Sequence, residues 1–105
     1  MNKLILIAGL ALFVSLPAFA GDPAAGQRKS QPCTQCHGPD GNSSAADFPK
    51  LAGQHYDYLV KAIKDYKSGA RKNPIMAPMV EKLTVRDIED LAAYYSSQRG
   101  LTLKY

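Results

Sequence analysis

The feature that most constrains this chain is the C-x-x-C-H pentapeptide of residues 33–37, which contains both of its cysteines. A disulfide between cysteines three residues apart closes a very small loop, so it would stabilise the fold little. A thioredoxin-like redox pair needs a βαβ context, and no alternating β-branched run flanks this segment. A structural zinc site needs four ligands, but the other histidine, His55, lies eighteen residues beyond His37 with no second paired cluster. A structural disulfide, a thioredoxin-like redox pair and a zinc site are therefore weaker interpretations of this pentapeptide than the one given next.

The spacing C-x-x-C-H is the signature of covalent c-type haem attachment. Two thiols three residues apart, on a turn that enters a short helix, can reach the two vinyl groups of one porphyrin. The next residue then presents its imidazole to the iron. We therefore predict one covalently bound haem c, with Cys33 and Cys36 as thioether anchors and His37 as an axial metal ligand.

The first twenty residues have the layout of a secretory signal peptide. Lys3 precedes an apolar run over residues 4–14, and a small-x-small triplet ends at Ala20. Eleven residues rise only about 16 Å as a helix, about half of the hydrocarbon thickness of a membrane, which disfavours a permanent span. We predict a signal peptide over residues 1–20, cleavage after Ala20 and a periplasmic domain over residues 21–105. An uncleaved N-terminal anchor is the alternative.

Cleavage would leave 85 residues with 12 basic and 9 acidic side chains, a formal net charge of +3. A chain of this size excludes two domains, an α/β barrel, a doubly wound nucleotide-binding fold and an enzyme with a large preformed pocket. Small domains often need a disulfide, a metal or a cofactor to complete the core. A covalently bound haem meets that need.

Helical periodicity dominates the rest of the sequence. Asp22 and a proline favour a first helix over residues 23–31, and apolar spacing predicts a second over residues 56–68. A capping box predicts a third that begins after Thr84 and ends at Gly100. Turn-forming residues predict a loop over residues 38–44. No segment alternates with a period of two, so we predict an all-α fold.

The second axial ligand has three candidates once Met1 leaves with the signal peptide: Met76, Met79 and His55. Both methionines lie in the proline-interrupted segment 73–79, which we predict to be a loop. A loop methionine between prolines differs from a core methionine on the apolar face of a helix. One of the two must merely pack, because only one can bind the iron. His55 precedes a helix, where a polar residue is ordinary.

Taken together, these segments resemble the class I c-type cytochromes over essentially all of residues 21–105. The match is closest to short bacterial periplasmic monohaem cytochromes and to one half of the dihaem ones. It implies a small cytochrome c fold of about four to five helices around one haem, with Gly26 allowing a close helix crossing against Tyr94. The segments that carry it, besides the pentapeptide, are residues 21–26, 40–42, 48–54, 83–84, 87–88 and 91–95.

The resemblance also implies roles for individual residues. His37 is the proximal ligand, and the Pro49 carbonyl orients its other ring nitrogen, which raises imidazole basicity and fixes the tautomer. In related sequences the ligand methionine lies about eight residues before the residue that caps the last helix. Counting back from Thr84 gives Met76, whereas Met79 is too close.

The predicted function is electron transfer between redox proteins rather than enzyme catalysis. We expect a monomer, with a dimer as the alternative, and no nucleic-acid partner. A basic rim would suit acidic docking surfaces, although the same residues could be ordinary solvated helix faces. The alternatives are a haem enzyme or gas sensor with an open sixth site, and an accessory subunit of one oxidoreductase. The rim residues are Lys50, Lys61, Lys64, Lys67, Arg71, Lys72 and Lys82.

Overall fold

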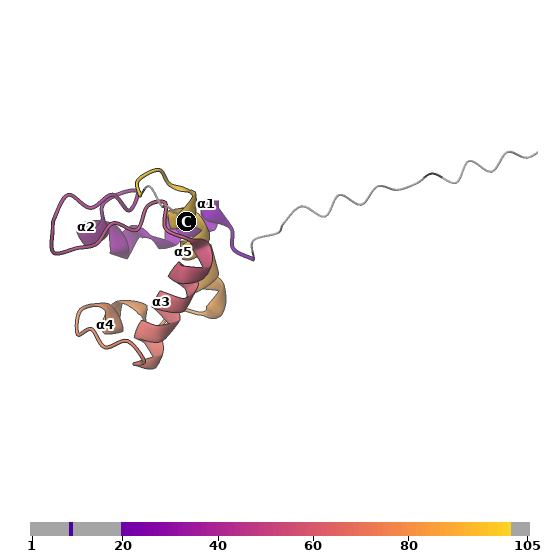
Figure 1. The fold of residues 1–105 in the computed structure, drawn as a ribbon. Helices are drawn as coiled ribbons and strands as arrows, with labels where there is room; N and C mark the ends of the chain where they lie inside the picture. Colours follow the sequence, from indigo (N-terminus) through magenta and orange to yellow (C-terminus); the bar gives the residue numbers. More distant parts are fainter. Residues whose placement is uncertain (1–8, 10–19, 102–105) are drawn as a thin grey trace, which may run out of the picture.

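The structure is a computed structural model that describes residue 9 and residues 20–101 (Figure 1). Apart from residues 9 and 20, the predicted signal peptide lies outside the described residues, as do residues 102–105 of the predicted domain. The described part contains five α-helices, one 3-10 helix and no strand, which confirms the all-α fold. None of its helices is long and apolar enough to cross a membrane.

The first helix, α1 (Pro23–Lys29), begins as predicted but is two residues shorter than expected. The Asp22 side chain caps it by accepting from the backbone N–H of Ala24 at 3.0 Å. Pro32 explains the early end, because proline lacks an N–H donor and disfavours a helical residue before it. The chain continues as the 3-10 helix η1 (Gln31–Cys33) and then as α2 (Thr34–His37).

Helix α3 (Tyr56–Ser68) has the predicted bounds and ends at Gly69, whose φ of +85° favours glycine. The segment after it was expected to be a loop, but it contains the short helix α4 (Met76–Val80). Asn73 explains this turn, since its side-chain oxygen accepts the backbone N–H groups of Ile75 and Met76 at 2.9 and 3.0 Å.

The last helix, α5 (Val85–Ser97), begins with the predicted capping box. The Thr84 hydroxyl oxygen accepts the Asp87 N–H at 3.1 Å, and the Asp87 carboxylate accepts the Thr84 N–H at 2.9 Å. The predicted end at Gly100 is wrong, because Gln98 already has extended backbone angles. The chain then turns back so that the N–H of Leu101 donates to the Ala52 carbonyl at 2.8 Å.

Helices α1 and α5 cross closely at Gly26, as the family resemblance implied. A Cβ atom at this position would lie 1.9 Å from the Asp90 carbonyl oxygen and 2.7 Å from the Cβ of Tyr94. Figure 1 shows α3 beside α5, with α2 and α4 extending to the same side of this pair. The core cluster lies between the long helices and consists of Leu59, Leu91, Ala92, Tyr94 and Tyr95.

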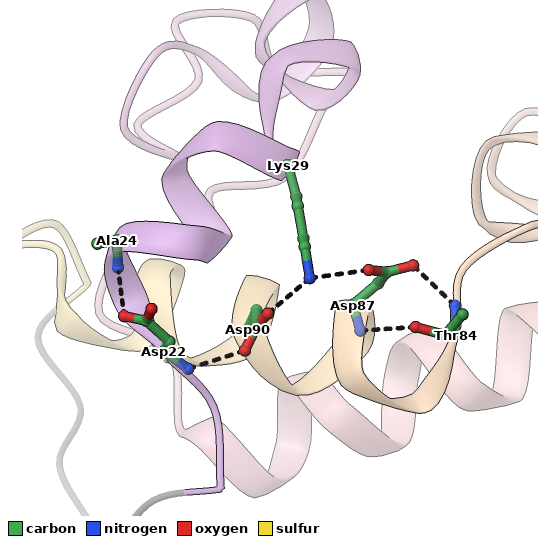
Figure 2. Close-up of polar contacts among 6 residues, drawn as sticks. All are labelled: Asp22, Ala24, Lys29, Thr84, Asp87 and Asp90. Atoms are coloured by element: carbon green, nitrogen blue, oxygen red, sulfur yellow. Dashed lines mark hydrogen bonds and ion pairs between the residues drawn. The ribbon is translucent and has the colours of Figure 1, made fainter.

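A network of charged residues, which the sequence did not predict, also joins α1 to α5 (Figure 2). The Lys29 ammonium lies 2.6 Å from the Asp90 carboxylate and 2.9 Å from the Asp87 carboxylate. The other Asp90 oxygen accepts the backbone N–H of Asp22 at 2.9 Å. Hydrogen bonds from Asp22 and Lys29 hold the pKa of Asp90 below its usual value. The network therefore satisfies a buried carboxylate while it fixes the start of α1.

Candidate functional site

The two cysteines lie on consecutive turns at the entrance to α2. Cys33 ends η1 and Cys36 lies within α2, and both are half-buried free thiols rather than a disulfide. Cys33 packs against the core cluster, and burial raises the pKa of its thiol. Local backbone bonds set this turn, because the N–H groups of Cys33 and Thr34 both donate to the Ser30 carbonyl. The sulfurs are thus held on one short segment directly before His37.

The imidazole of His37 is buried, with only 6% of the residue exposed. Its Nδ1 atom lies 2.8 Å from the carbonyl oxygen of Pro49. A carbonyl can only accept, so Nδ1 carries a hydrogen, and in the neutral imidazole the lone pair is then on Nε2. Among the described residues Nε2 has no hydrogen-bond partner. This arrangement, with one ring nitrogen tied to a carbonyl and the other available, is typical of a metal-binding histidine.

The loop that carries Pro49 is anchored to the end of α5. The Gly41 carbonyl accepts the N–H of Leu51 at 2.8 Å, and the Gly53 N–H donates to the Tyr95 carbonyl at 2.9 Å. Asn42 adds a side-chain bond to the Arg99 carbonyl at 2.8 Å. These contacts position the Pro49 carbonyl opposite α2, although Pro49 itself is exposed.

The three candidates for the second axial position differ in burial. Met76, the first residue of α4, is half-buried and lies near His37. Met79 is 43% exposed. His55 is an exposed residue at the N-terminal boundary of α3. Of the three side chains, only Met76 therefore combines partial burial with proximity to His37.

Two tyrosines of α5 make contacts that the sequence did not predict, since the family resemblance implied Tyr94 only as the neighbour of Gly26. The Tyr94 hydroxyl donates to the Pro39 carbonyl at 3.0 Å, which ties α5 to the loop after His37. The Tyr95 hydroxyl is buried and makes no hydrogen bond within the described residues. A helical period identifies buried positions, but it does not indicate what a buried hydroxyl faces. The sequence carried no signal for this second feature.

The donor set suits a porphyrin better than a bare ion. Within residues 20–101, no group of three or more His, Cys, Asp or Glu side chains is arranged to hold a metal ion. A porphyrin brings four equatorial nitrogen ligands of its own, so the protein needs to add only axial ligands and anchors. Two free thiols and one imidazole with an available Nε2 meet that requirement. Apolar side chains that pack on the core while staying partly exposed are also present: Leu51, Val60, Ile63 and Leu83.

Comparisons with known proteins agree with this geometry. Residues 23–98 match the family described as cytochrome c. Cytochrome c4 of Pseudomonas aeruginosa is 47% identical over 100 residues, which cover 94% of this chain and 50% of that protein. Cytochrome c-554(548) of Halomonas halodenitrificans is 49% identical over 82 residues, covering 75% of this chain and 99% of that protein.

A solved structure shares the fold. The crystal structure of reduced recombinant cytochrome c4 from Pseudomonas stutzeri superimposes with a TM-score of 0.74 at 48% identity, covering 77% of this chain and 47% of that chain. The chain thus spans about half of the length of the cytochromes c4 that it matches. This coverage fits the predicted resemblance to one half of the dihaem bacterial cytochromes.

Proposed function

This chain belongs to the cytochrome c family, whose members carry covalently bound haem c and take part in electron transport, and we propose that it is a monohaem periplasmic electron carrier. Its iron would be bound by His37 and Met76 and its porphyrin held by Cys33 and Cys36. The proposal makes the protein a carrier rather than an enzyme. The observation that supports it most is the His37 imidazole, whose Nδ1 atom is tied to a carbonyl while Nε2 is available.

The Pro49 carbonyl has a positioning role in this proposal. By accepting from Nδ1 at 2.8 Å, it fixes the ring orientation of His37 and selects the tautomer that leaves Nε2 free. The same bond increases the electron density on the imidazole and so strengthens it as a ligand. Pro49 lies on a loop whose neighbours bond to Gly41 and α5, so the carbonyl is held in place by the fold.

Met76 is proposed as the sixth ligand because it lies near His37 and its backbone is held by Asn73. Met79, three residues on, is an exposed residue on the surface of α4. When bound, the haem supplies one-electron exchange between Fe(III) and Fe(II), and a thioether ligand favours the reduced form. The chain contributes axial ligands, a partly apolar surround and a fixed geometry, which keeps structural change on electron transfer small.

The proposed partners are redox proteins with acidic docking surfaces, met in small transient contacts. Exposed lysines on α3 and in the segment after it give this region its positive charge, although Lys61 also pairs with Asp65 at 2.6 Å. Lys64 and Lys72 are exposed and make no ion pair within the described residues. Rates of electron transfer with an acidic partner should therefore fall as the salt concentration increases.

We propose that the mature protein is a monomer in the periplasm, after cleavage of the signal peptide behind Ala20.

Optical spectra test the proposed ligands. The oxidised protein should show the weak long-wavelength absorption of methionine sulfur bound to ferric iron. Met76→Ala should abolish this band, and the matched variant Met79→Ala should retain it. Ready binding of carbon monoxide by the ferrous wild type would instead indicate an open sixth site, and the electron-carrier proposal would fail in favour of an enzyme or gas sensor.

Mass spectrometry of the exported protein tests attachment and processing together. We expect one haem per chain, linked through both cysteines, and an N-terminus at Gly21. Replacing Cys33 or Cys36 by alanine should leave a single thioether and a changed haem spectrum. A protein without covalent haem would contradict the proposed attachment, and a retained leader would contradict the cleavage site.

A further inference from the structure

The Tyr95 hydroxyl is an unpaired polar group in the core. Tyr95 is only 3% exposed, and its hydroxyl oxygen is fully buried without a hydrogen-bond partner. Buried polar groups in folded proteins nearly always have a partner, so an exception needs a physical explanation. The neighbouring residue Tyr94 satisfies the rule, because its hydroxyl donates to the Pro39 carbonyl.

Packing fixes the orientation of the Tyr95 ring and therefore the position of its hydroxyl. A Cβ atom on Gly41 would lie 2.7 Å from Cδ1 of this ring, so the ring rests directly on the glycine backbone. The Tyr94 ring also packs against it, with ring centroids 5.1 Å apart. Turning the ring away would break both contacts. The orientation of the hydroxyl is therefore set by packing, and the hydroxyl must find its partner at this position.

Cys33 and Ser30 are neighbouring side chains that affect the pKa of this hydroxyl, although neither makes a hydrogen bond with it in this structure. Burial raises the pKa of Tyr95, and Cys33 raises it further. Burial also raises the pKa of Cys33, while the Tyr95 hydroxyl acts in the opposite direction, as a donor to sulfur would. The Ser30 hydroxyl already donates to the Gln27 carbonyl at 2.7 Å. Cys33 also packs against the core cluster that contains Tyr95.

We propose that the Tyr95 hydroxyl donates a hydrogen bond to the Cys33 sulfur in the haem-bound protein and acts as a positioning residue for that thioether. The inference rests on the attachment at Cys33 proposed above. A thioether sulfur has lone pairs and no hydrogen, so it can accept this bond but cannot donate one. The bond would satisfy the unpaired hydroxyl and fix the Cys33 side chain in one orientation.

Such a bond also has an electrostatic consequence. It places the positive end of the O–H dipole beside a sulfur attached to the porphyrin, where it disfavours the additional positive charge of the oxidised state. The reduced form gains relative stability, so the reduction potential rises. Tyr95 would therefore affect the potential without touching the iron.

Tyr95→Phe tests this inference in the haem-loaded protein, with Tyr94→Phe as the matched control. Both variants remove one hydroxyl from neighbouring buried rings of α5. Tyr95→Phe should lower the midpoint potential, whereas Tyr94→Phe should reduce stability and leave the potential close to that of the wild type. Equal potentials in the wild type and Tyr95→Phe would overturn the inference.

Resonance Raman spectra give a second test, made on the wild type with Tyr94→Phe as the control. Exchange into deuterated buffer should shift the carbon–sulfur stretching band of the wild type, because a deuteroxyl group then bonds to the sulfur. Tyr94→Phe should keep this shift. A loaded wild-type protein without the shift would refute the proposed hydrogen bond and leave the proposed attachment at Cys33 intact. A mass spectrum without haem on Cys33 would refute the proposed attachment as well.

Discussion

Gly26 of α1 contacts the backbone of Asp90 and the Cβ of Tyr94 on α5 so closely that no larger residue fits. A methyl group at Gly26 would lie 1.9 Å from the Asp90 carbonyl oxygen, which is backbone and cannot rotate away. The two helices must therefore separate if this residue acquires a side chain. The close crossing in turn positions η1 and the cysteines, which directly follow α1.

Gly26→Ala should destabilise the protein despite the better helix propensity of alanine. The propensity gain is about 1 kcal/mol, whereas overpacking a helix contact costs about 3 kcal/mol. We expect a net loss of about 2 kcal/mol, measured by urea unfolding. Gly69→Ala is the control, because its Cβ meets nothing within 4 Å and pays only for the positive φ. That variant should lose about 1 kcal/mol. A Gly26→Ala protein as stable as the wild type would contradict the close crossing.

The Asp90 carboxylate should stabilise the same helix pair through its two partners. Asp90→Ala removes the acceptor for the Asp22 N–H and one anion beside Lys29. We expect a loss of about 2 kcal/mol from these charged hydrogen bonds. Asp90→Asn keeps an acceptor oxygen for Asp22, so it should lose about half as much. Equal losses in both variants would show that the ion pair alone, rather than the Asp22 bond, carries the effect.

The pKa of Asp87 predicts how stability depends on pH. Hydrogen bonds from Lys29 and Thr84 lower it from 3.8 to about 2. Below pH 4 the unfolded chain therefore binds a proton more readily than the folded protein, and the free energy of unfolding falls as the pH falls towards 2. Because the pair is partly solvated, the loss should be about 1 kcal/mol.

Asp87→Asn isolates this contribution in urea unfolding measured from pH 5 to pH 2. Asparagine still accepts the Thr84 N–H but has no charge for Lys29. The variant should be less stable than the wild type at pH 5 and should approach it near pH 2. Curves that stay parallel over this range would mean that Asp87 has the same pKa in both states.

The features that could be predicted from the sequence are those determined by residues close to one another in the chain. The capping box at Thr84, the stop at Gly69 and the spacing of apolar residues over 56–68 each depend on neighbours within a few positions. The early end of α1 also has a local signal, Pro32, which was outweighed by the helical pattern before it. The cap at Asp22 and the first proline predicted where this helix begins, whereas Pro32 is the signal for where it ends.

The features that were missed depend on distant partners. Nothing near Lys29 in the sequence indicates that it bridges two carboxylates some sixty residues away. The unpaired hydroxyl of Tyr95 is similar, because the residues packed around this side chain include Gly41 and Cys33, more than fifty positions away. The 2.8 Å contact between His37 and Pro49 was implied by the family resemblance and by nothing in the local pattern. Contacts between residues this far apart in the sequence can be identified only when the three-dimensional fold is known.

Asn73 should control how firmly Met76 is held. Its side-chain oxygen accepts two N–H groups at the start of α4, at Ile75 and Met76, and such a cap contributes about 1 kcal/mol. Asn73→Ala should loosen this turn, so the methionine–iron absorption band should disappear at a lower temperature than in the wild type. Asn73→Asp keeps the acceptor oxygen, so its band should disappear at nearly the same temperature as in the wild type. Because the proposed anchors at Cys33 and Cys36 lie elsewhere, the haem should stay attached in both variants. If the band disappeared at the same temperature in Asn73→Ala as in the wild type, the cap on α4 would have no effect on how firmly Met76 is held, which would contradict this role.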